Sequence, residues 1–210
     1  MDAAIIGAGI GGLTAALCLH EKGQQVTVFE AAPQPRALGL GINLLPHGVR
    51  ILNGLALDAG LRDIGVPTNK LQYMTRFGKT ILREPRGREA GYRWPQYSVH
   101  RGQLQMILMD AVRARLGEAR IRAGHRLTGF EQRSDGVRAT FADSTTGATI
   151  EAGPARMLIG ADGLHSAVRR QLYPEEGPPA YSGIMMWRGA AERDRFLDGR
   201  TMIIAGDAAK

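Results

Sequence analysis

The chain has 210 residues, of which 44% are hydrophobic and 22% charged, a composition typical of a globular protein with a sizeable core. Its net charge of +7 comes from basic residues scattered among acidic ones, which argues against a nucleic-acid partner and for a general attraction of anionic small molecules. Because glycines interrupt the apolar run near the start and no basic leader precedes it, we expect no membrane span and a cytoplasmic location.

The start of the chain predicts a βαβ unit. Residues 3–6 form a short apolar strand, and residues 13–22 carry apolar side chains at helical spacing. Residues 25–30 (QVTVFE) are β-branched and aromatic enough to form a second strand. Since the helix connects them, the two strands are expected to be parallel neighbours.

The middle of the chain alternates between helical and strand patterns. Pro46 opens a helix predicted over residues 46–59. Residues 71–82 are strand-like, and a loop rich in proline, glycine and arginine follows as far as residue 98. Residues 102–116 return to helical periodicity. We interpret residues 71–98 as an excursion out of the first domain.

An antiparallel meander is predicted next. Three short strands, over residues 126–132, 137–142 and 148–152, are separated by turn residues. The chain then forms an apolar strand over residues 156–159, a second glycine turn and a helix that ends at Leu172. A linker rich in proline and glycine follows.

Beyond the linker, residues 183–189 and 201–205 predict two further strands around the turn at Asp198-Gly199. These strands start a second sheet that the remaining residues do not complete. Their apolar side chains need a covering layer, so we expect the 210-residue chain to self-associate.

A glycine motif follows the first strand directly and opens the first helix. Its sequence, GAGIGG, satisfies the pattern G-x-G-x-x-G. Gly7 permits a tight turn, Gly9 lets a pyrophosphate approach the backbone, and Gly12 lets the helix pack closely on the sheet. Glu30 ends the second strand, where a carboxylate can accept hydrogen bonds from an adenosine ribose. This motif predicts a dinucleotide site, but it does not distinguish FAD from NAD.

A second motif surrounds the later glycine turn, in the stretch IGADGLHSAVR over residues 159–169. Two further stretches are GLGIN over residues 39–43, ahead of Pro46, and HRGQL over residues 100–104. Together these segments resemble the FAD-dependent aromatic hydroxylases, the class A flavoprotein monooxygenases, in their N-terminal part. On their own, Ser166 could be only a helix N-cap and Asp162 only a turn residue.

The resemblance covers essentially the whole chain and implies further cofactor contacts. The residues concerned are Gly41 and Ile42 beside the flavin ring, Arg101 and Gln105 along the FAD chain, and Gly163 together with Asp162, which also serves the nicotinamide donor. The stretches 84–87, 92–105 and 186–202 are most similar to the phenazine-modifying branch of the family.

The resemblance also implies an activity. The protein would hydroxylate an aromatic substrate with NADH or NADPH and O2, through a flavin C4a-hydroperoxide. No metal is implied, and the catalytic residues are unknown: His47 could assist substrate deprotonation or be a solvated helix residue. The alternatives are an FAD-binding fragment without hydroxylase activity and an NAD-dependent oxidoreductase.

The predicted fold class is α/β. A Rossmann-like FAD-binding domain has a parallel sheet with the βαβ unit and, in addition, the antiparallel meander. The start of a β-sheet substrate domain follows. Residues 1–70 and 99–178 form the first domain, and residues 71–98 and 179–210 the incomplete second one. The family has a later Gly-Asp motif that Gly206-Asp207-Ala208-Ala209 imitates too early in the chain, so we expect an accidental match. We therefore expect a fragment that binds FAD poorly and does not hydroxylate.

Overall fold

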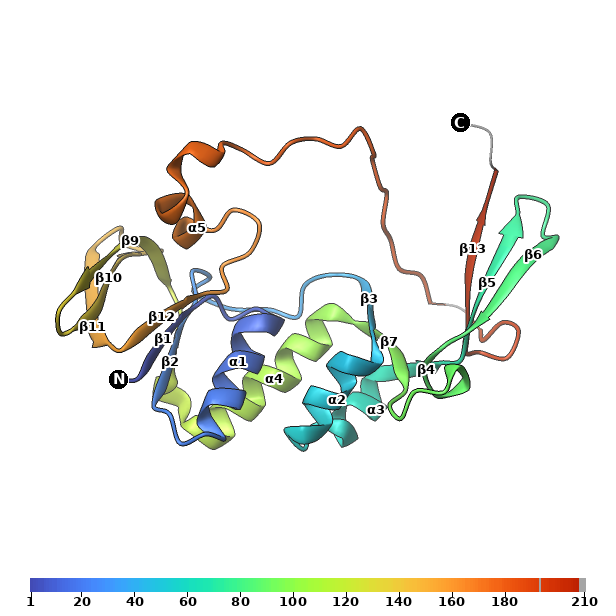
Figure 1. The fold of residues 1–210 in the computed structure, drawn as a ribbon, viewed down its shortest axis with the longest axis horizontal. Helices are drawn as coiled ribbons and strands as arrows, with labels where there is room; N and C mark the ends of the chain where they lie inside the picture. The colour runs from blue at the N-terminus through green and yellow to red at the C-terminus, as the bar shows by residue number, and fades with distance from the viewer. Residues whose placement is uncertain (193, 208–210) are drawn as a thin grey trace. The chain divides into compact units, whose positions relative to one another are not determined.

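The computed structural model describes residues 1–192 and 194–207 (Figure 1). These residues form two compact units. Unit 1 comprises Met1–Ala37 and Gln105–Met186, and unit 2 comprises Leu38–Leu104 and Trp187–Lys210. No helix in the described part of the chain combines the length and the apolar character that crossing a bilayer requires.

A parallel sheet with the strand order β12-β1-β2-β8 forms the centre of unit 1. Its strands are β1 (Ala3–Ile6), β2 (Val26–Phe29), β8 (Ile121–Arg122) and β12 (Met157–Gly160). Both neighbours of β1 run parallel to it, with Ala3 opposite Val26 on one side and Met157 on the other. Every residue of β1 and β2 is buried, which explains why their side chains are apolar on both faces at every position except Thr27.

Two helices contribute large buried side chains to unit 1. Helix α1 (Ile10–His20) packs on β1 and β2 and buries Leu13 and Leu17 completely. Helix α4 (Arg101–Leu116) buries Leu108 and Val112. At about 25 cal/mol per Å² of apolar surface, each fully buried leucine stabilises the fold by about 1.5–3 kcal/mol.

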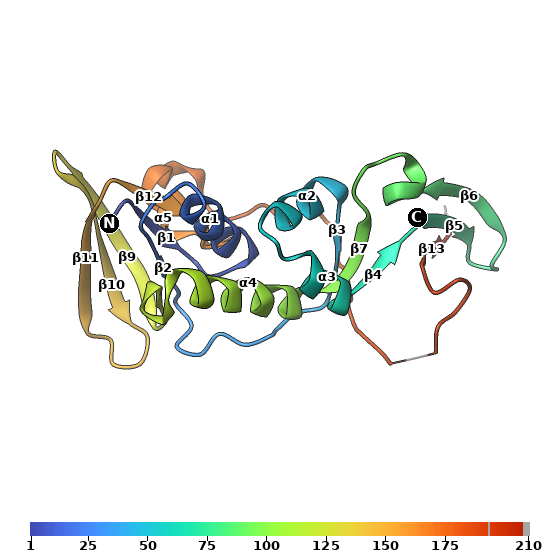
Figure 2. The same ribbon diagram turned by 90° about the horizontal axis from the view of Figure 1, so that it is seen from below.

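The antiparallel meander of unit 1 has the order β11-β10-β9 and is easily followed in Figure 2. Its strands are β9 (His125–Arg133), β10 (Gly136–Asp143) and β11 (Thr149–Ala155). An apolar cluster joins it to the parallel sheet, because the rings of Phe29 in β2 and Phe141 in β10 stack with their centroids 4.6 Å apart. Helix α5 (Ala167–Leu172) is tied to β9 by Gln171, whose side-chain amide exchanges two hydrogen bonds with the backbone of Phe130.

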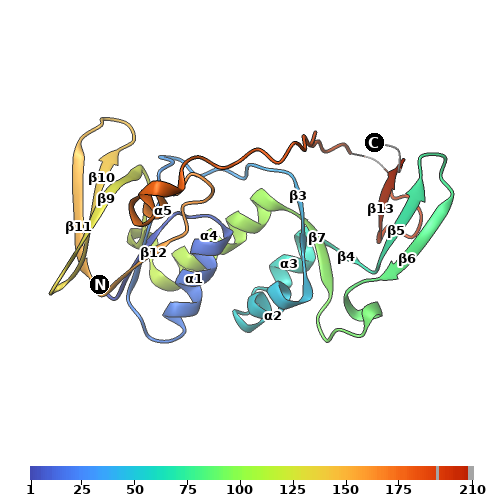
Figure 3. The same cartoon turned by 45° about the horizontal axis from the view of Figure 1, so that its top comes forward.

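Unit 2 contains two three-stranded sheets. The first has the order β3-β7-β4 and is antiparallel, with strands β3 (Gly41–Leu44), β4 (Gly65–Thr68) and β7 (Gln96–His100). Two helices, α2 (Pro46–Gly54) and α3 (Asp58–Ile64), connect β3 to β4. In the second sheet β5 (Lys70–Thr75) lies between an antiparallel β6 (Thr80–Pro85) and a parallel β13 (Thr201–Gly206), as Figure 3 shows.

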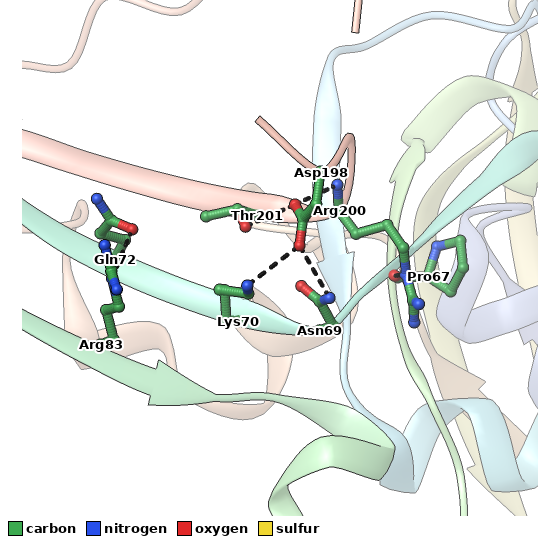
Figure 4. A network of polar contacts seen from close by, with 8 residues as sticks. All are labelled: Pro67, Asn69, Lys70, Gln72, Arg83, Asp198, Arg200 and Thr201. Carbon is green, nitrogen blue, oxygen red and sulfur yellow. Dashed lines mark hydrogen bonds and ion pairs between the residues drawn. The ribbon is translucent and has the colours of Figure 1, made fainter. Parts of the chain in front are cut away.

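The carboxylate of Asp198 ties the start of β13 to the start of β5 (Figure 4). It accepts hydrogen bonds from Thr201 Oγ1 at 2.7 Å, from Asn69 Nδ2 at 3.0 Å and from the backbone N–H of Arg200 at 3.0 Å. Lys70 Nζ lies 3.2 Å away. These donors, that of Thr201 first, hold the pKa of Asp198 well below its ordinary value. The negative charge therefore holds together segments about 130 residues apart in the sequence.

Most of the predicted elements are confirmed. The α/β fold class, the βαβ unit, the meander and the return of the chain to the first sheet are all present. The predicted domain boundaries at residues 70, 98 and 178 stay a prediction.

Three predictions are wrong. The single helix over residues 46–59 is two helices, because Ala56 adopts a φ of +53° between them. Strand β7 begins inside the loop that is predicted to reach residue 98, and strands β3 and β4 lie in stretches where no strand is predicted. Residues 183–189 form no strand: Trp187 is 91% exposed, and none of the described strands pairs with this stretch. Residues typical of strands form a strand only where a neighbouring strand is present to pair with them by backbone hydrogen bonds.

Candidate functional site

The glycine turn after β1 is built so that two of its glycines cannot be replaced without moving the backbone. Gly7 has a φ of +105°, and a Cβ there would lie 2.4 Å from the carbonyl oxygen of Ala161. A Cβ on Gly12 would lie 2.0 Å from the carbonyl oxygen of Gly7. Both distances are far inside van der Waals contact, so the predicted roles in turning and close packing fit the structure.

Gly9 differs from these two glycines. It is the N-cap of α1, with φ −74° and ψ 177°, a conformation open to any residue. A Cβ on Gly9 would meet no atom within 4 Å. Nothing in the protein itself therefore requires glycine here, and the open space leaves room for a ligand to approach the backbone.

The N-terminus of α1 is the electropositive end of an 11-residue helix. No side chain caps it, and its first turn contains no acidic residue. The first N–H groups of a helix have no partner inside the helix, and those of α1 begin at the open space beside Gly9. This arrangement suits a phosphate or pyrophosphate group.

Two side chains hold the peptide groups of Ala8, in the middle of the glycine turn. Glu30 Oε2 accepts a hydrogen bond from the Ala8 N–H at 2.8 Å, and Gln105 Nε2 donates one to the Ala8 carbonyl at 2.8 Å. The second oxygen of Glu30 accepts from the N–H of Ala32, also at 2.8 Å. The turn is therefore held in shape from both sides before any ligand binds.

Glu30 and Gln105 keep capacity for a ligand after these bonds. An ionised carboxylate offers about four lone-pair positions, of which two are used. The amide oxygen of Gln105 is not part of its bond to Ala8. The sequence pattern singles out both residues as ligand contacts but gives no sign of their bonds to Ala8, because Gln105 lies 97 residues further along the chain.

The second glycine turn lies directly against the first. A Cβ on Gly7 would be 3.1 Å from the Cα of Asp162, and Gly163 follows with a φ of +79° and open space around it. Asp162 Oδ2 accepts from the N–H of Ala167 at 2.7 Å, and Oδ1 accepts from Ser166 Oγ at 2.5 Å. Ser166 is the N-cap of α5. In this structure the carboxylate of Asp162 is thus engaged at the start of α5.

The other predicted site residues lie in unit 2. Gly41 pairs with His100 and Ile42 with Val99, which places β3 beside the end of β7. The backbone N–H of Arg101 bonds to the carbonyl of Leu40 at 3.0 Å, and its side-chain stem packs 3.4 Å from the position a Cβ on Gly39 would occupy. The structure thus brings Gly41, Ile42 and Arg101 together within this unit.

The structure also bears on two other predictions, those on metal binding and on the late Gly-Asp motif. Within the described residues, no three side chains of the histidine, cysteine, aspartate and glutamate types are placed to hold a metal ion. Asp207 Oδ2 lies 3.3 Å from Arg76 Nη1 at the end of β13. Ala208 and Ala209, the rest of the late Gly-Asp motif, lie outside the described residues.

Comparison with known families finds one model, described as "FAD binding domain", that matches residues 1–188. A curated relative from Lysobacter antibioticus, phenazine 1,6-dicarboxylic acid hydroxylase, is 46% identical over 207 residues, or 98% of this chain and 51% of its own length. The 3-amino-4-hydroxybenzoate 2-monooxygenase of Streptomyces cremeus is 37% identical over 189 residues, covering 89% of this chain and 45% of the relative. The chain spans about half the length of the curated relatives it matches.

Solved structures agree with this match. An HpxO variant from Klebsiella pneumoniae complexed with FAD aligns with a TM-score of 0.65 at 30% identity, over 81% of this chain and 42% of that one. The flavin-dependent monooxygenase PieE, in complex with FAD and substrate, aligns with a TM-score of 0.70 over 81% of this chain and 31% of that one. Its identity is 24%, so this second alignment supports the fold alone.

Proposed function

The chain belongs to the FAD binding domain family, and from this premise we propose that it is the FAD-holding part of an NADH- or NADPH-dependent monooxygenase that hydroxylates an aromatic compound with O2. The observation that carries the proposal is the uncapped N-terminus of α1, which begins at the open space beside Gly9. The names of the relatives support the reaction class, since both act on aromatic acids as hydroxylases or monooxygenases. We also propose that residues 1–70 and 99–178 bind FAD, and that residues 71–98 and 179–210 belong to the substrate side.

In this proposal the residues of unit 1 bind the adenosine and pyrophosphate end of FAD. The first N–H groups of α1 donate to the pyrophosphate, while Gly7 and Gly12 keep the turn close to the sheet. Glu30 accepts from the ribose hydroxyls with its unused lone pairs, and Gln105 adds a contact along the chain of the cofactor.

The remaining predicted contacts lie nearer the flavin end of FAD in this proposal. Gly41 and Ile42 offer backbone groups beside the ring, and Arg101 binds along the FAD chain. Asp162 and Gly163 take part at the second turn, where Asp162 keeps its bonds to the start of α5. Bound FAD would supply the redox chemistry between the nicotinamide donor and O2. The protein would orient the substrate and exclude water from the reacting groups.

The experiment that tests the proposal is a titration of the purified 210-residue chain with FAD and, separately, with NAD, followed by the quenching of flavin fluorescence and by calorimetry. We expect FAD to bind saturably but weakly, and the FAD-bound protein to show a flavin absorbance spectrum. Tight binding of NAD without FAD binding would favour an NAD-dependent oxidoreductase instead.

A second measurement separates the hydroxylase from an FAD-binding unit without activity. NADH or NADPH oxidation and O2 uptake are recorded with and without an aromatic acid. Oxidation stimulated by the acid, with a hydroxylated product, supports the full proposal. FAD binding without any stimulated oxidation limits the function of these 210 residues to holding the cofactor.

A further inference from the structure

A pocket of unit 2 has no part in the cofactor roles proposed above. It has a volume of about 750 Å³ and lies between the start of α2 and the segment that joins β6 to β7. This volume is within the range of about 300–1,000 Å³ that is usual for small-molecule sites. Its functional side chains are those of His47, Arg50, Arg86, Tyr92, Arg93 and Trp94.

The pocket has an excess of positive charge. Three arginines and a single carboxylate, that of Glu84, line it. Arg86 Nη2 donates to Glu84 Oε2 at 2.5 Å, so this pair neutralises itself. Arg50 and Arg93 form no ion pair with any residue in the described ranges 1–192 and 194–207. Two guanidinium groups are therefore available to an anion.

One wall of the pocket, formed by the segment that joins β6 to β7, carries aromatic side chains. The guanidinium carbon of Arg93 lies 5.1 Å from the centroid of the Trp94 ring, and Tyr92 beside it is 60% exposed. A cation held over one aromatic ring leaves further ring surface to stack on a flat ligand. Charge and aromatic surface thus lie together on adjacent residues.

The wall is also preformed by its backbone. Gly87 has a φ of +56°, and a Cβ there would lie 2.5 Å from the backbone nitrogen of Gln96. The Tyr92 N–H bonds to the Gly87 carbonyl at 3.3 Å, and the Gly91 N–H bonds to the Arg88 carbonyl at 3.0 Å. A wall closed by its own hydrogen bonds loses less entropy when a ligand binds.

We propose that this pocket binds a planar aromatic carboxylate. The ring would stack against Trp94 and Tyr92, and the carboxylate would accept hydrogen bonds from both Arg50 and Arg93. The site is separate from the glycine turns, so this binding does not require FAD. The proposal names a class of ligand and the pocket that binds it. It rests on the proposed function only where it expects this ligand to be a substrate.

The test is calorimetric titration of the 210-residue chain without FAD. The probes are phenazine-1,6-dicarboxylate and 3-amino-4-hydroxybenzoate, with phenazine and cyclohexanecarboxylate as controls that lack the charge or the aromatic ring. We expect the two aromatic acids to bind and both controls to bind at least about tenfold more weakly, because each loses one of the two kinds of contact.

Matched variants locate the site. Arg50→Gln and Arg93→Gln should each weaken binding of the acids about tenfold, the effect of losing a charge-assisted hydrogen bond. Arg88→Gln is the control, because Arg88 belongs to the same segment but does not line the pocket. Equal urea midpoints for the variants and the wild type exclude a folding defect.

Three results would overturn the proposal. The first is that neither aromatic acid binds, and the second is that Arg88→Gln weakens binding as much as the pocket variants, which would indicate a general charge effect. The third is displacement of the acid by saturating FAD, which would assign the pocket to the cofactor. Since FAD binding is measured separately, failure here leaves the proposed cofactor function intact.

Discussion

Replacing Gly9 by alanine separates the needs of the fold from those of the cofactor. The backbone at Gly9 suits any residue, and the added Cβ meets no protein atom within 4 Å. Alanine is a slightly poorer N-cap than glycine, so we expect Gly9→Ala to lower the free energy of unfolding by no more than about 1 kcal/mol. Gly12→Ala should cost about 1–3 kcal/mol, because its Cβ would lie 2.0 Å from a backbone oxygen that cannot rotate away.

Gly11→Ala is the matched control for both variants. Gly11 lies in the first turn of α1, is exposed, and a Cβ there also meets nothing within 4 Å. Since alanine favours a helix more than glycine does, this variant should be as stable as the wild type or up to about 1 kcal/mol more stable.

The expected effect of Gly9→Ala is on FAD. A methyl group placed where the pyrophosphate approaches the backbone should cost about 1–3 kcal/mol, as overpacking does in a filled site. That loss corresponds to an increase of roughly 5- to 150-fold in the dissociation constant. The assay is a fluorescence titration with FAD, beside urea unfolding of the same three variants without ligand.

Two outcomes would refute the reasoning. If Gly9→Ala binds FAD as the wild type does, the open space beside α1 does not receive the cofactor. If Gly9→Ala loses as much stability as Gly12→Ala, the glycine is required by the fold and not by the ligand.

Three further variants probe the remaining contacts. Glu30→Ala should weaken FAD binding by about 1.5–3 kcal/mol, and it should also lower the free energy of unfolding without ligand because the N–H groups of Ala8 and Ala32 lose their acceptor. An unchanged dissociation constant for FAD and an unchanged free energy of unfolding would argue against both roles of Glu30. Arg101→Lys should preserve the backbone bond to Leu40 and the fold but lose flavin on gel filtration, since an ammonium cannot reproduce a planar fork; full retention of flavin would count against the role. The pKa of Asp198 is lower in the folded protein than in the unfolded chain, where an aspartate has a pKa near 4, so its carboxylate stabilises the fold above that pH and this stabilisation is lost as the pH falls. The difference in urea midpoint between the wild type and Asp198→Asn should therefore shrink from pH 7 to pH 3. A difference that stays constant would contradict this.

The elements that the sequence predicts well are those whose pattern reflects burial. Strands β1 and β2 are buried along their whole length, so their apolar runs predict them directly. The meander is recognisable because its turns carry Asp135-Gly136 and a second polar, glycine-containing stretch. Gly7 and Gly12 are predicted with their correct roles, since each role follows from the absence of a Cβ.

The missed elements depend on contacts between distant residues. Strand β3 is half exposed, β4 contains Pro67, and each is a strand only because β7 pairs with it. For the same reason the bonds from Glu30 and Gln105 to Ala8 have no local signature. The pocket beside Trp94 also joins segments from two parts of the sequence, so the residues that line it could be grouped only from the structure.

The position of β1 between β2 and β12 has a consequence for the order in which the molecule is made. One neighbour of β1 is complete at Phe29, but the other begins at Met157, and the backbone that closes the glycine turn is that of Ala161. At about 5–20 residues per second, a ribosome needs roughly 6 to 26 seconds to pass from one to the other. Throughout this interval β1, the strand that leads into the glycine motif, lacks its neighbour on one side. The glycine turn is therefore completed only when β12 and Ala161 have been made, although its own sequence is translated first.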